Sequence, residues 1–400
     1  MHAGRIVARV VGPCLERLHA KRAAACQRVV TAVVAGAALR LSAIALSLRA
    51  GTRYRHRLKC VDRLLGNAGL HAVRAELYGA LAARWLSGVR RVLLVVDWSD
   101  LTPDQRWHWL RASVAVEGRS VTLYEEVHPQ RQLGHPKVHR QFLARVAELL
   151  PPGCEPIVMT DAGFHATWFK AVAARGWSFV GRIRGRDMVR GDAGPWRGAT
   201  TLYGQATQHP RDLGPHTYVR SNPIDTRLVL AKRPARGRHH LNIYGRRRAG
   251  RTSRKCARGA REPWLLAASR QLDHLSAASI IQLYAQRMGI EESFRDTKNL
   301  RLGQGLHSTR SRTRERLQML LLIGHLAGFV QRLIGEQAKA HQLELNFMAT
   351  RRTTRPEISV LTLARRIVLS DSSSDWLDRL APWAAIPPLR TQAINACART

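Results

Sequence analysis

Four residues in the C-terminal half of the chain share one face of a predicted helix, and their side chains are suited to phosphate chemistry. They are Tyr284, Arg287, Glu291 and Lys298, within the proline-free segment YAQRMGIEESFRDTK. At about 100° of rotation per residue, all four fall on a stripe roughly 60° wide, whereas Glu292 and Asp296 fall outside it. A carboxylate between two cations suits a site that binds a metal ion beside a phosphate. The alternative is a surface helix with spaced salt bridges.

Two further acids stand at the ends of predicted strands. Asp97 ends the run RVLLVVD and Asp161 ends EPIVMTD, and both runs are typical of buried strands. If these strands are parallel neighbours, their carboxylates converge at the edge where α/β proteins place their sites. With Glu291 they form an all-oxygen ligand set suited to two Mg²⁺ or Mn²⁺ ions, and not to zinc. Two metal ions held in this way can catalyse phosphodiester cleavage, and Arg287 and Lys298 would hold the phosphate.

The charge balance predicts a polyanionic partner. The chain has 65 Lys and Arg against 28 Asp and Glu, a net charge of +37 spread over 400 residues. A soluble chain this basic repels itself unless it meets a polyanion, and the most abundant polyanion is nucleic acid. We therefore expect double-stranded DNA as the partner.

Other features exclude several classes of protein. The six cysteines are scattered without a CxxC pair, which argues against a zinc knuckle or a disulfide framework and fits a cytoplasmic, nucleoid-associated protein. The apolar stretch from Val29 to Leu48 has Arg40 near its centre, so we predict a buried helix and no membrane span. Too much chain precedes this stretch for a secretory signal.

Sequence patterns divide the chain into helical ends and an α/β middle. Residues 1–88 read as helices with basic faces, which is typical of a DNA-end-binding domain. Residues 89–185 have the order βββαβαβ, which predicts a mixed sheet with helices packed on it. Residues 263–312 add an apolar strand and the helix with Glu291, and residues 313–400 are again helical, with possible synapsis contacts.

The segment 186–262 interrupts the α/β pattern. It breaks up into Gly, Pro and short strand-like runs, so we expect a β-rich basic insertion. Between Lys232 and Arg261 it carries twelve Lys or Arg and no acid, which is typical of a disordered or nucleic-acid-contacting loop.

The site residues and several longer phrases resemble the DDE transposases of bacterial insertion sequences. Tyr284, Arg287, Glu291 and Lys298 match, position by position, the Y-(2)-R-(3)-E-(6)-K signature of the insertion sequence four family. Seven phrases are similar to the branch of that family named for the Tn-ten tetracycline-resistance element, and they span nearly the whole chain. They are VDRLLGN, VVDWSD, LRASVAVEGRSVTLYEE, TDAGFHATWFKAV, GWSFVGRIRG, EPWLLA and RMGIEESFRD.

This resemblance implies a fold and a reaction. The fold is α/β, with a ribonuclease-H-like core, a β-rich insertion, and helical N- and C-terminal domains. Asp97, Asp161 and Glu291 would be the catalytic metal ligands of a metal-dependent endonuclease. The family cuts both strands at the transposon ends through a hairpin intermediate, in a complex of two transposases and two ends, so a homodimer is expected. Trp264 corresponds to the residue that holds a base flipped from the hairpin, whereas Met288 stands where one branch has a second aromatic residue.

Three classes of function are weighed. The first is a cut-and-paste DNA transposase, and the second is a DNA-binding derivative that is catalytically silent. The intact acids Asp97, Asp161 and Glu291 argue against the second class. The third class is another ribonuclease-H-like endonuclease, such as a junction resolvase, against which the signature and Trp264 argue. For Trp264 itself, the alternative is a tryptophan that simply packs in the core.

Overall fold

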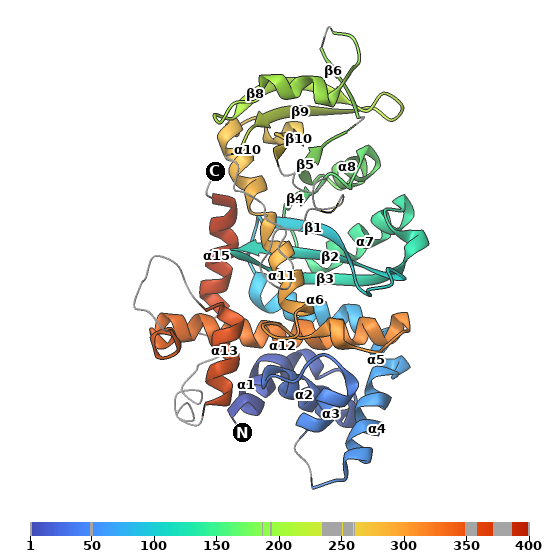
Figure 1. The fold of residues 1–400 in the computed structure, drawn as a ribbon, viewed down its shortest axis with the longest axis vertical. Coiled ribbons are helices and arrows are strands. Elements are labelled where there is room, and N and C mark those ends of the chain that lie inside the picture. Colours follow the sequence, from blue (N-terminus) through green and yellow to red (C-terminus); the bar gives the residue numbers. More distant parts are fainter. Residues whose placement is uncertain are drawn as a thin grey trace.

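A single mixed β-sheet runs from the middle of the molecule to its upper end in Figure 1, and helices fill the lower half. This computed structural model describes residues 2–48, 51–185, 187–192, 194–233, 250, 259, 261–348, 358–370 and 386–398. Among these residues the sheet has ten strands in the order β3-β2-β1-β4-β5-β10-β9-β8-β6-β7. The first five of these positions make up the core, and the last four belong to the insertion.

The core half of the sheet has the predicted ribonuclease-H-like arrangement. Its strands are β1 (Leu93–Asp100), β2 (Trp107–Val116), β3 (Arg119–Pro129), β4 (Ile157–Thr160) and β5 (Ser178–Ile183). β1, β2 and β3 form an antiparallel meander, whereas β4 and β5 run parallel to β1. The helices α7 (Pro136–Leu149) and α8 (Ala166–Ala173) connect β3 to β4 and β4 to β5. The predicted element order is confirmed.

The first strand is longer than its apolar run suggested. The sequence predicts that the strand ends at Asp97, but β1 continues to Asp100. Ser99 and Asp100 remain paired with Trp109 and His108 on β2, because the antiparallel ladder continues beyond the buried part of the strand. Asp97 therefore lies within β1, and the residues before and after it in the strand both pair with β2.

The insertion is β-rich and continues the same sheet. Its strands are β6 (Met188–Gly191), β7 (Arg197–Gly198), β8 (Arg211–Tyr218) and β9 (Ile224–Ala231). β10 (Trp264–Ala268) pairs antiparallel with β9 on one edge and with β5 on the other, and so joins the insertion to the core. Most of the basic run from Lys232 to Arg261 lies outside the described residues.

The N-terminal part is helical, as predicted, but one predicted helix is divided. Its helices are α1 (His2–Val11), α2 (Ala20–Val34), α3 (Leu41–Ser47), α4 (Tyr54–Leu65), α5 (Ala68–Ala72) and α6 (Arg74–Leu86). The single buried helix predicted from Val29 to Leu48 is wrong, because the chain turns at Gly36, whose φ is 104°, and α3 starts afresh at Leu41. The stretch is nevertheless largely buried.

One long helix lies between the sheet and the N-terminal helices α1, α2 and α4, whereas α6 contacts β3. α12 (Arg314–Ala340) packs against α2, α1 and α4 on one side and β3 on the other, as Figure 1 shows. It is long and apolar enough to cross a membrane, but 94% of its apolar stretch is buried inside the protein. The remaining described helices of the C-terminal part are α13 (Val360–Leu369) and α15 (Ile386–Ala398).

The described chain also contains short 3₁₀ turns. They are η1 (Gly12–Leu15), η2 (Gln130–Gln132), η3 (Ala199–Gln205), η4 (Arg270–Leu272), η5 (Leu306–Ser308) and η6 (Leu343–Phe347). η4 lies between β10 and the helices that carry the signature, and η5 follows them.

Candidate active site

The signature segment forms two helices and not the single helix predicted. α10 (Ala277–Ala285) and α11 (Met288–Lys298) are separated by Gln286 and Arg287. At this junction the backbone tightens, since Arg287 N–H donates to the Tyr284 carbonyl and Ile290 N–H donates to that of Arg287. α11 then passes so close to β3 that a Cβ at Gly289 would lie 2.7 Å from the Arg119 carbonyl group. The break allows α11 to settle on the sheet.

The two strand acids lie side by side. β1 and β4 are parallel neighbours, which confirms the condition on which their convergence depended, and Val95 pairs with Met159. Asp97 and Asp161 are each two residues further along, so their side chains leave the same face of the sheet at its carboxyl edge. Asp97 accepts a hydrogen bond from the Trp98 N–H at 2.8 Å. Asp161 accepts one from the Gly163 N–H at the same distance.

Arg287 connects the first acid to the third. Its Nη1 donates to Asp97 Oδ2 at 3.1 Å and its Nη2 donates to Glu291 Oε1 at 2.6 Å. The side chains of Arg287 and Asp97 are 11% and 12% exposed, whereas that of Glu291 is 42% exposed. Glu291 therefore has more freedom to exchange partners than Asp97.

Lys298 approaches the same strand from the other end of α11. Its Nζ donates to the Ser99 hydroxyl at 2.7 Å, and Ser99 is two residues beyond Asp97 on β1. Asp97, Asp161, Glu291 and Lys298 thus line one cavity of about 520 Å³. The other residues of its wall are Trp98, Ser99, Phe294, Arg295, Asn299 and His307.

The charges in this cavity change one another's protonation. Burial and the neighbouring charge of Asp161 raise the pKa of Asp97 to about 7, even though Arg287 opposes the shift. Burial lowers the pKa of Lys298 to about 8. Burial also acts to lower the pKa of Arg287, but Tyr284, Asp97 and Glu291 outweigh it, and the net shift is upward. The cavity therefore concentrates negative charge that a cation neutralises.

The acids fit a hard divalent cation by their chemistry. All three are carboxylates on the wall of one cavity, and carboxylate oxygens are the ligands that hard divalent cations prefer. Within the described residues, no three His, Cys, Asp or Glu side chains lie close enough together to hold one ion. The guanidinium of Arg287 is the cation that lies between Asp97 and Glu291. The metal ligands therefore stay a prediction.

Trp264 lies beside the signature and is only partly buried. Its ring meets the ring of Tyr284 edge to face, with centroids 4.9 Å apart and an interplanar angle of 84°. The guanidinium of Arg233 lies 4.5 Å from the Trp264 ring centroid. Tyr284 is itself buried, and burial raises its pKa to about 12. Tyr284 and Arg233 thus both contact the tryptophan ring, and the residue as a whole remains partly exposed.

A buried arginine holds the opposite side of α11, and the sequence analysis did not find it. Arg111 stands on β2 directly opposite Asp97 in the ladder. Its Nη1 donates to the Ser293 hydroxyl at 3.0 Å and its Nη2 donates to the Thr297 hydroxyl at 3.3 Å. Both hydroxyls belong to α11, so this side chain fixes the helix over the sheet.

Arg111 is in turn held by a carboxylate that is fully buried. Its Nε donates to Glu125 Oε2 at 2.9 Å, and the side chains of the pair are 4% and 0% exposed. Glu125 also accepts hydrogen bonds from the Trp109 indole at 2.8 Å and the Tyr78 hydroxyl at 2.9 Å. The signal in the sequence is a charged residue inside each of two apolar strands, WHWLRASVAV and RSVTLYEEV, where burial makes an ionic partner necessary.

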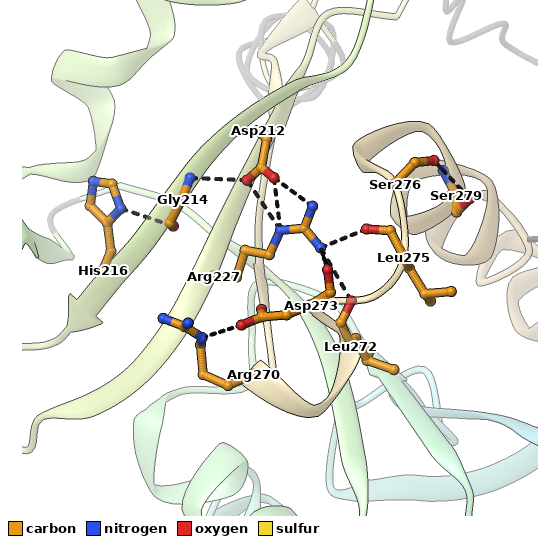
Figure 2. Close-up of polar contacts among 10 residues, drawn as sticks. All are labelled: Asp212, Gly214, His216, Arg227, Arg270, Leu272, Asp273, Leu275, Ser276 and Ser279. Atoms are coloured by element: carbon orange, nitrogen blue, oxygen red, sulfur yellow. Dashed lines mark hydrogen bonds and ion pairs between the residues drawn. The ribbon is translucent and has the colours of Figure 1, made fainter.

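A second arginine ties the insertion to the segment that leads into the signature helices (Figure 2). Arg227 on β9 donates from Nε and Nη2 to the carboxylate of Asp212 on β8, at 3.0 Å and 2.5 Å. Its Nη1 donates to the carbonyl oxygens of Leu272, Asp273 and Leu275, between β10 and α10. The planar guanidinium of Arg227 bonds to Asp212 through Nε and Nη2 and to the three carbonyl groups through Nη1. It therefore fixes the position of the insertion relative to the start of α10.

Comparison with known proteins gives the chain a family. The chain resembles a cryo-EM structure of the piggyBac transposase synaptic complex with hairpin DNA, with 12% identity, a TM-score of 0.44, and coverage of 94% of this chain and 79% of that chain. No curated protein matches it. The model of the family described as the transposase DDE domain matches residues 89–327, which is more than half of the sequence. The chain therefore belongs to the DDE transposase domain family.

Proposed function

We propose that this DDE transposase binds the terminal inverted repeats of an insertion sequence and moves it by cut-and-paste transposition. Asp97, Asp161 and Glu291 are the catalytic acids and hold two Mg²⁺ or Mn²⁺ ions. Bound there, the ions supply activation of the attacking oxygen and stabilisation of the departing one. The observation that carries the proposal is the cavity itself, which is lined by Asp97 on β1, by Asp161 directly after the parallel strand β4, and by Glu291 on α11.

The other signature residues bind the DNA backbone in this proposal. Arg287 already contacts two of the acids and has a planar group suited to a phosphate, so it orients the scissile phosphate beside them. Lys298, at the other end of the cavity, holds a neighbouring phosphate as a point charge. Trp264, supported by Tyr284, stacks on a base flipped from a hairpin intermediate.

The rest of the chain recognises and pairs the DNA ends. Residues 1–88 form the end-binding domain, residues 89–185 and 263–312 the catalytic core, and residues 186–262 the insertion. Residues 313–400 supply contacts between two protomers in a homodimeric synaptic complex. The charge of +37 supports DNA as the partner, and the protein acts where the bacterial nucleoid lies, in the cytoplasm. The signature favours the insertion sequence four family, in its Tn-ten branch.

A DNA-binding derivative without activity, or another ribonuclease-H-like endonuclease, is the competing function. Strand cleavage of DNA that carries the terminal repeats tests all three. Asp97→Ala, Asp161→Ala or Glu291→Ala should reduce cleavage at least about a thousandfold, because each removes several kcal/mol of transition-state stabilisation. End binding should persist, and a chelator should abolish cleavage by the unaltered protein.

Glu292→Ala is the matched control. Its carboxylate pairs with Arg295 at 2.8 Å and is absent from the wall of the cavity. This variant should cleave within about threefold of the unaltered protein, because an exposed pair contributes little. A dead Glu292 variant beside an active Glu291 variant would overturn the assignment. Cleavage by the unaltered protein in excess chelator would overturn the role of the metal ions.

A further inference from the structure

The loop that follows α11 presents two large apolar side chains to solvent beside the active-site cavity. Leu300 is 56% exposed and Leu302 is 65% exposed. Lys298 and Asn299, immediately before them, belong to the cavity wall. Exposed leucines scattered singly need no explanation, but two in one loop at the edge of a catalytic cavity do.

The loop holds these leucines outward in a fixed conformation. The Asn299 side chain accepts hydrogen bonds from the N–H groups of Arg301 and Leu302, at 2.8 Å and 2.9 Å. The backbone carbonyl of Asn299 accepts a hydrogen bond from the Gly303 N–H at 3.2 Å. A Cβ at Gly303 would lie 2.0 Å from the carbonyl oxygen of Asp296, so the loop folds tightly back on the end of α11. The exposure of the leucines is therefore built in by the backbone.

A buried glutamine anchors the same loop to the protein behind it. Gln304 N–H donates to the Asp296 carbonyl at 2.7 Å. Its side-chain amide donates to the carbonyl of Gly324 on α12 at 2.8 Å, and the residue is 6% exposed. Since α12 is the buried central helix, a force on the exposed leucines is resisted by the core of the molecule.

The surroundings of the leucines favour DNA as the occupant of this surface. Arg301 lies between them and is exposed, and Arg295 in the cavity wall has a side chain that is 65% exposed. Cations that reach phosphates, alternating with apolar side chains that reach base faces, are the pattern by which proteins open a base step. A cavity that receives a scissile phosphate brings the adjacent bases to this loop.

We infer that Leu300 and Leu302 form an apolar wedge that enters the DNA next to the scissile phosphate and keeps the adjacent bases unstacked. The inference rests on the proposed function and adds to it a contact with bases from the loop after α11, in addition to the contact proposed for Trp264 on β10. The wedge separates the bases, which makes the strand end accessible to the acids.

The test uses full-length protein and terminal-repeat DNA that carries 2-aminopurine next to the cleaved phosphate. The fluorescence of this base rises when it unstacks, so the measurement needs no cleavage and is made without divalent cations. The Leu300→Ala/Leu302→Ala variant should lose most of the rise and cleave about ten- to a hundredfold more slowly. Its end binding should stay within about threefold, because affinity comes from the phosphate contacts.

Three comparisons make the result specific. Leu369→Ala removes a leucine that is also 65% exposed but lies on α13, and it should behave as the unaltered protein. Leu302→Phe should retain the rise, because a larger apolar group still inserts. DNA with a mismatched pair at the labelled position should restore cleavage by the double alanine variant, because the wedge is no longer needed.

A full fluorescence rise in the double variant would overturn the wedge, and so would a cleavage defect that mismatched DNA leaves unchanged. The second outcome would indicate that the alanines disturb the acids instead of the bases. Failure of the proposed function is distinguishable, since it would leave the unaltered protein unable to cleave even mismatched DNA while the fluorescence measurement still reports on the wedge.

Discussion

The two sides of α11 use charge in opposite ways. On the closed side, the hydroxyls of Ser293 and Thr297 accept hydrogen bonds from Arg111. The partner of Arg111, Glu125, is fully buried and accepts two further hydrogen bonds, from Trp109 and Tyr78. The open side comprises Arg287, Glu291 and Lys298. The side chain of Glu291 is 42% exposed and accepts a hydrogen bond from Arg287. The closed side is saturated and fixes the helix, whereas the open side keeps capacity for a ligand.

This difference explains how one helix serves both rigidity and exchange. A buried ion pair contributes little net stability because desolvation offsets attraction, but it restricts the helix to one position. The closed side thus sets where Glu291 and Lys298 stand relative to β1. The proposed metal ions would then compete with Arg287 for Asp97 and Glu291 on the open side.

The largest expected effect comes from breaking the closed side. Arg111→Met should lower the free energy of unfolding by about 3–5 kcal/mol, because Glu125 is left buried without its cation. Urea denaturation measures the loss. Arg111→Met with Glu125→Gln should recover much of it, since the amide carries no charge, its oxygen can accept from the Trp109 indole, and its NH2 can donate to the Tyr78 hydroxyl oxygen. A double variant no more stable than the single one would contradict this account.

The exposed pair on the same helix provides the control. Arg295→Met removes an ion pair with Glu292 whose side chains are 65% and 30% exposed. The expected change in the free energy of unfolding is below about 1 kcal/mol, because surface pairs are screened. Equal losses at Arg111 and Arg295 would remove the distinction between the two sides.

The next effect concerns chemistry beside the open side. Trp264→Ala should permit the first nick but slow hairpin formation or opening about ten- to a hundredfold, since stacking on a base contributes roughly 1–3 kcal/mol. Denaturing gels resolve nicked, hairpin and double-cut products. Trp264→Phe should keep most of the activity. Uniform loss of all three products, with lower stability, would show that Trp264 only packs the protein.

The last effect depends on pH and concerns α12, which lies behind the closed side. His325 on α12 stacks on Tyr78 with centroids 4.7 Å apart, and burial together with Arg111 lowers its pKa to about 3. The unfolded chain binds a proton there below about pH 6.5 while the folded chain does not, so stability falls as the pH drops from 6.5 toward 3. His325→Phe should gain about 1 kcal/mol over the unaltered protein for each unit below pH 6.5.

Urea denaturation between pH 7.5 and 5 gives this difference directly. At pH 7.5 both proteins should bind no proton at this position, so the stability difference there reports only packing. A constant difference across the range would mean that His325 is protonated in the folded protein, contrary to its burial.

Sequence patterns identified the two strands that lead to Asp97 and Asp161, because apolar runs are local features. Asp97 and Asp161 follow runs whose burial depends on a few adjacent residues, and the order of elements then limits how the strands pair. From the sequence, the convergence of the two acids depended on the two strands being parallel neighbours, and the structure shows that they are. The extension of β1 to Asp100 was missed, because it depends on a partner strand and not on its own hydrophobicity.

Features that depend on distant residues were beyond sequence patterns. The break at Gln286 and Arg287 reflects how α11 meets the backbone of Arg119, which no helical periodicity encodes. The pairing of Arg111 with Glu125 and with the hydroxyls of α11 links residues up to 186 positions apart. A charged residue in an apolar strand signals that a partner exists without saying which one.

The late position of β10 has a consequence for how the protein is made. β5 gains its second neighbour only when residues 264–268 have been synthesised, and the Asp97–Arg287 contact closes a loop of 190 positions. At roughly 5–20 residues per second, the 130 positions between Asp161 and Glu291 take on the order of ten seconds to translate. Such high contact order slows folding. During translation, most of the Lys and Arg residues are therefore synthesised before Glu291, the third acid of the proposed site.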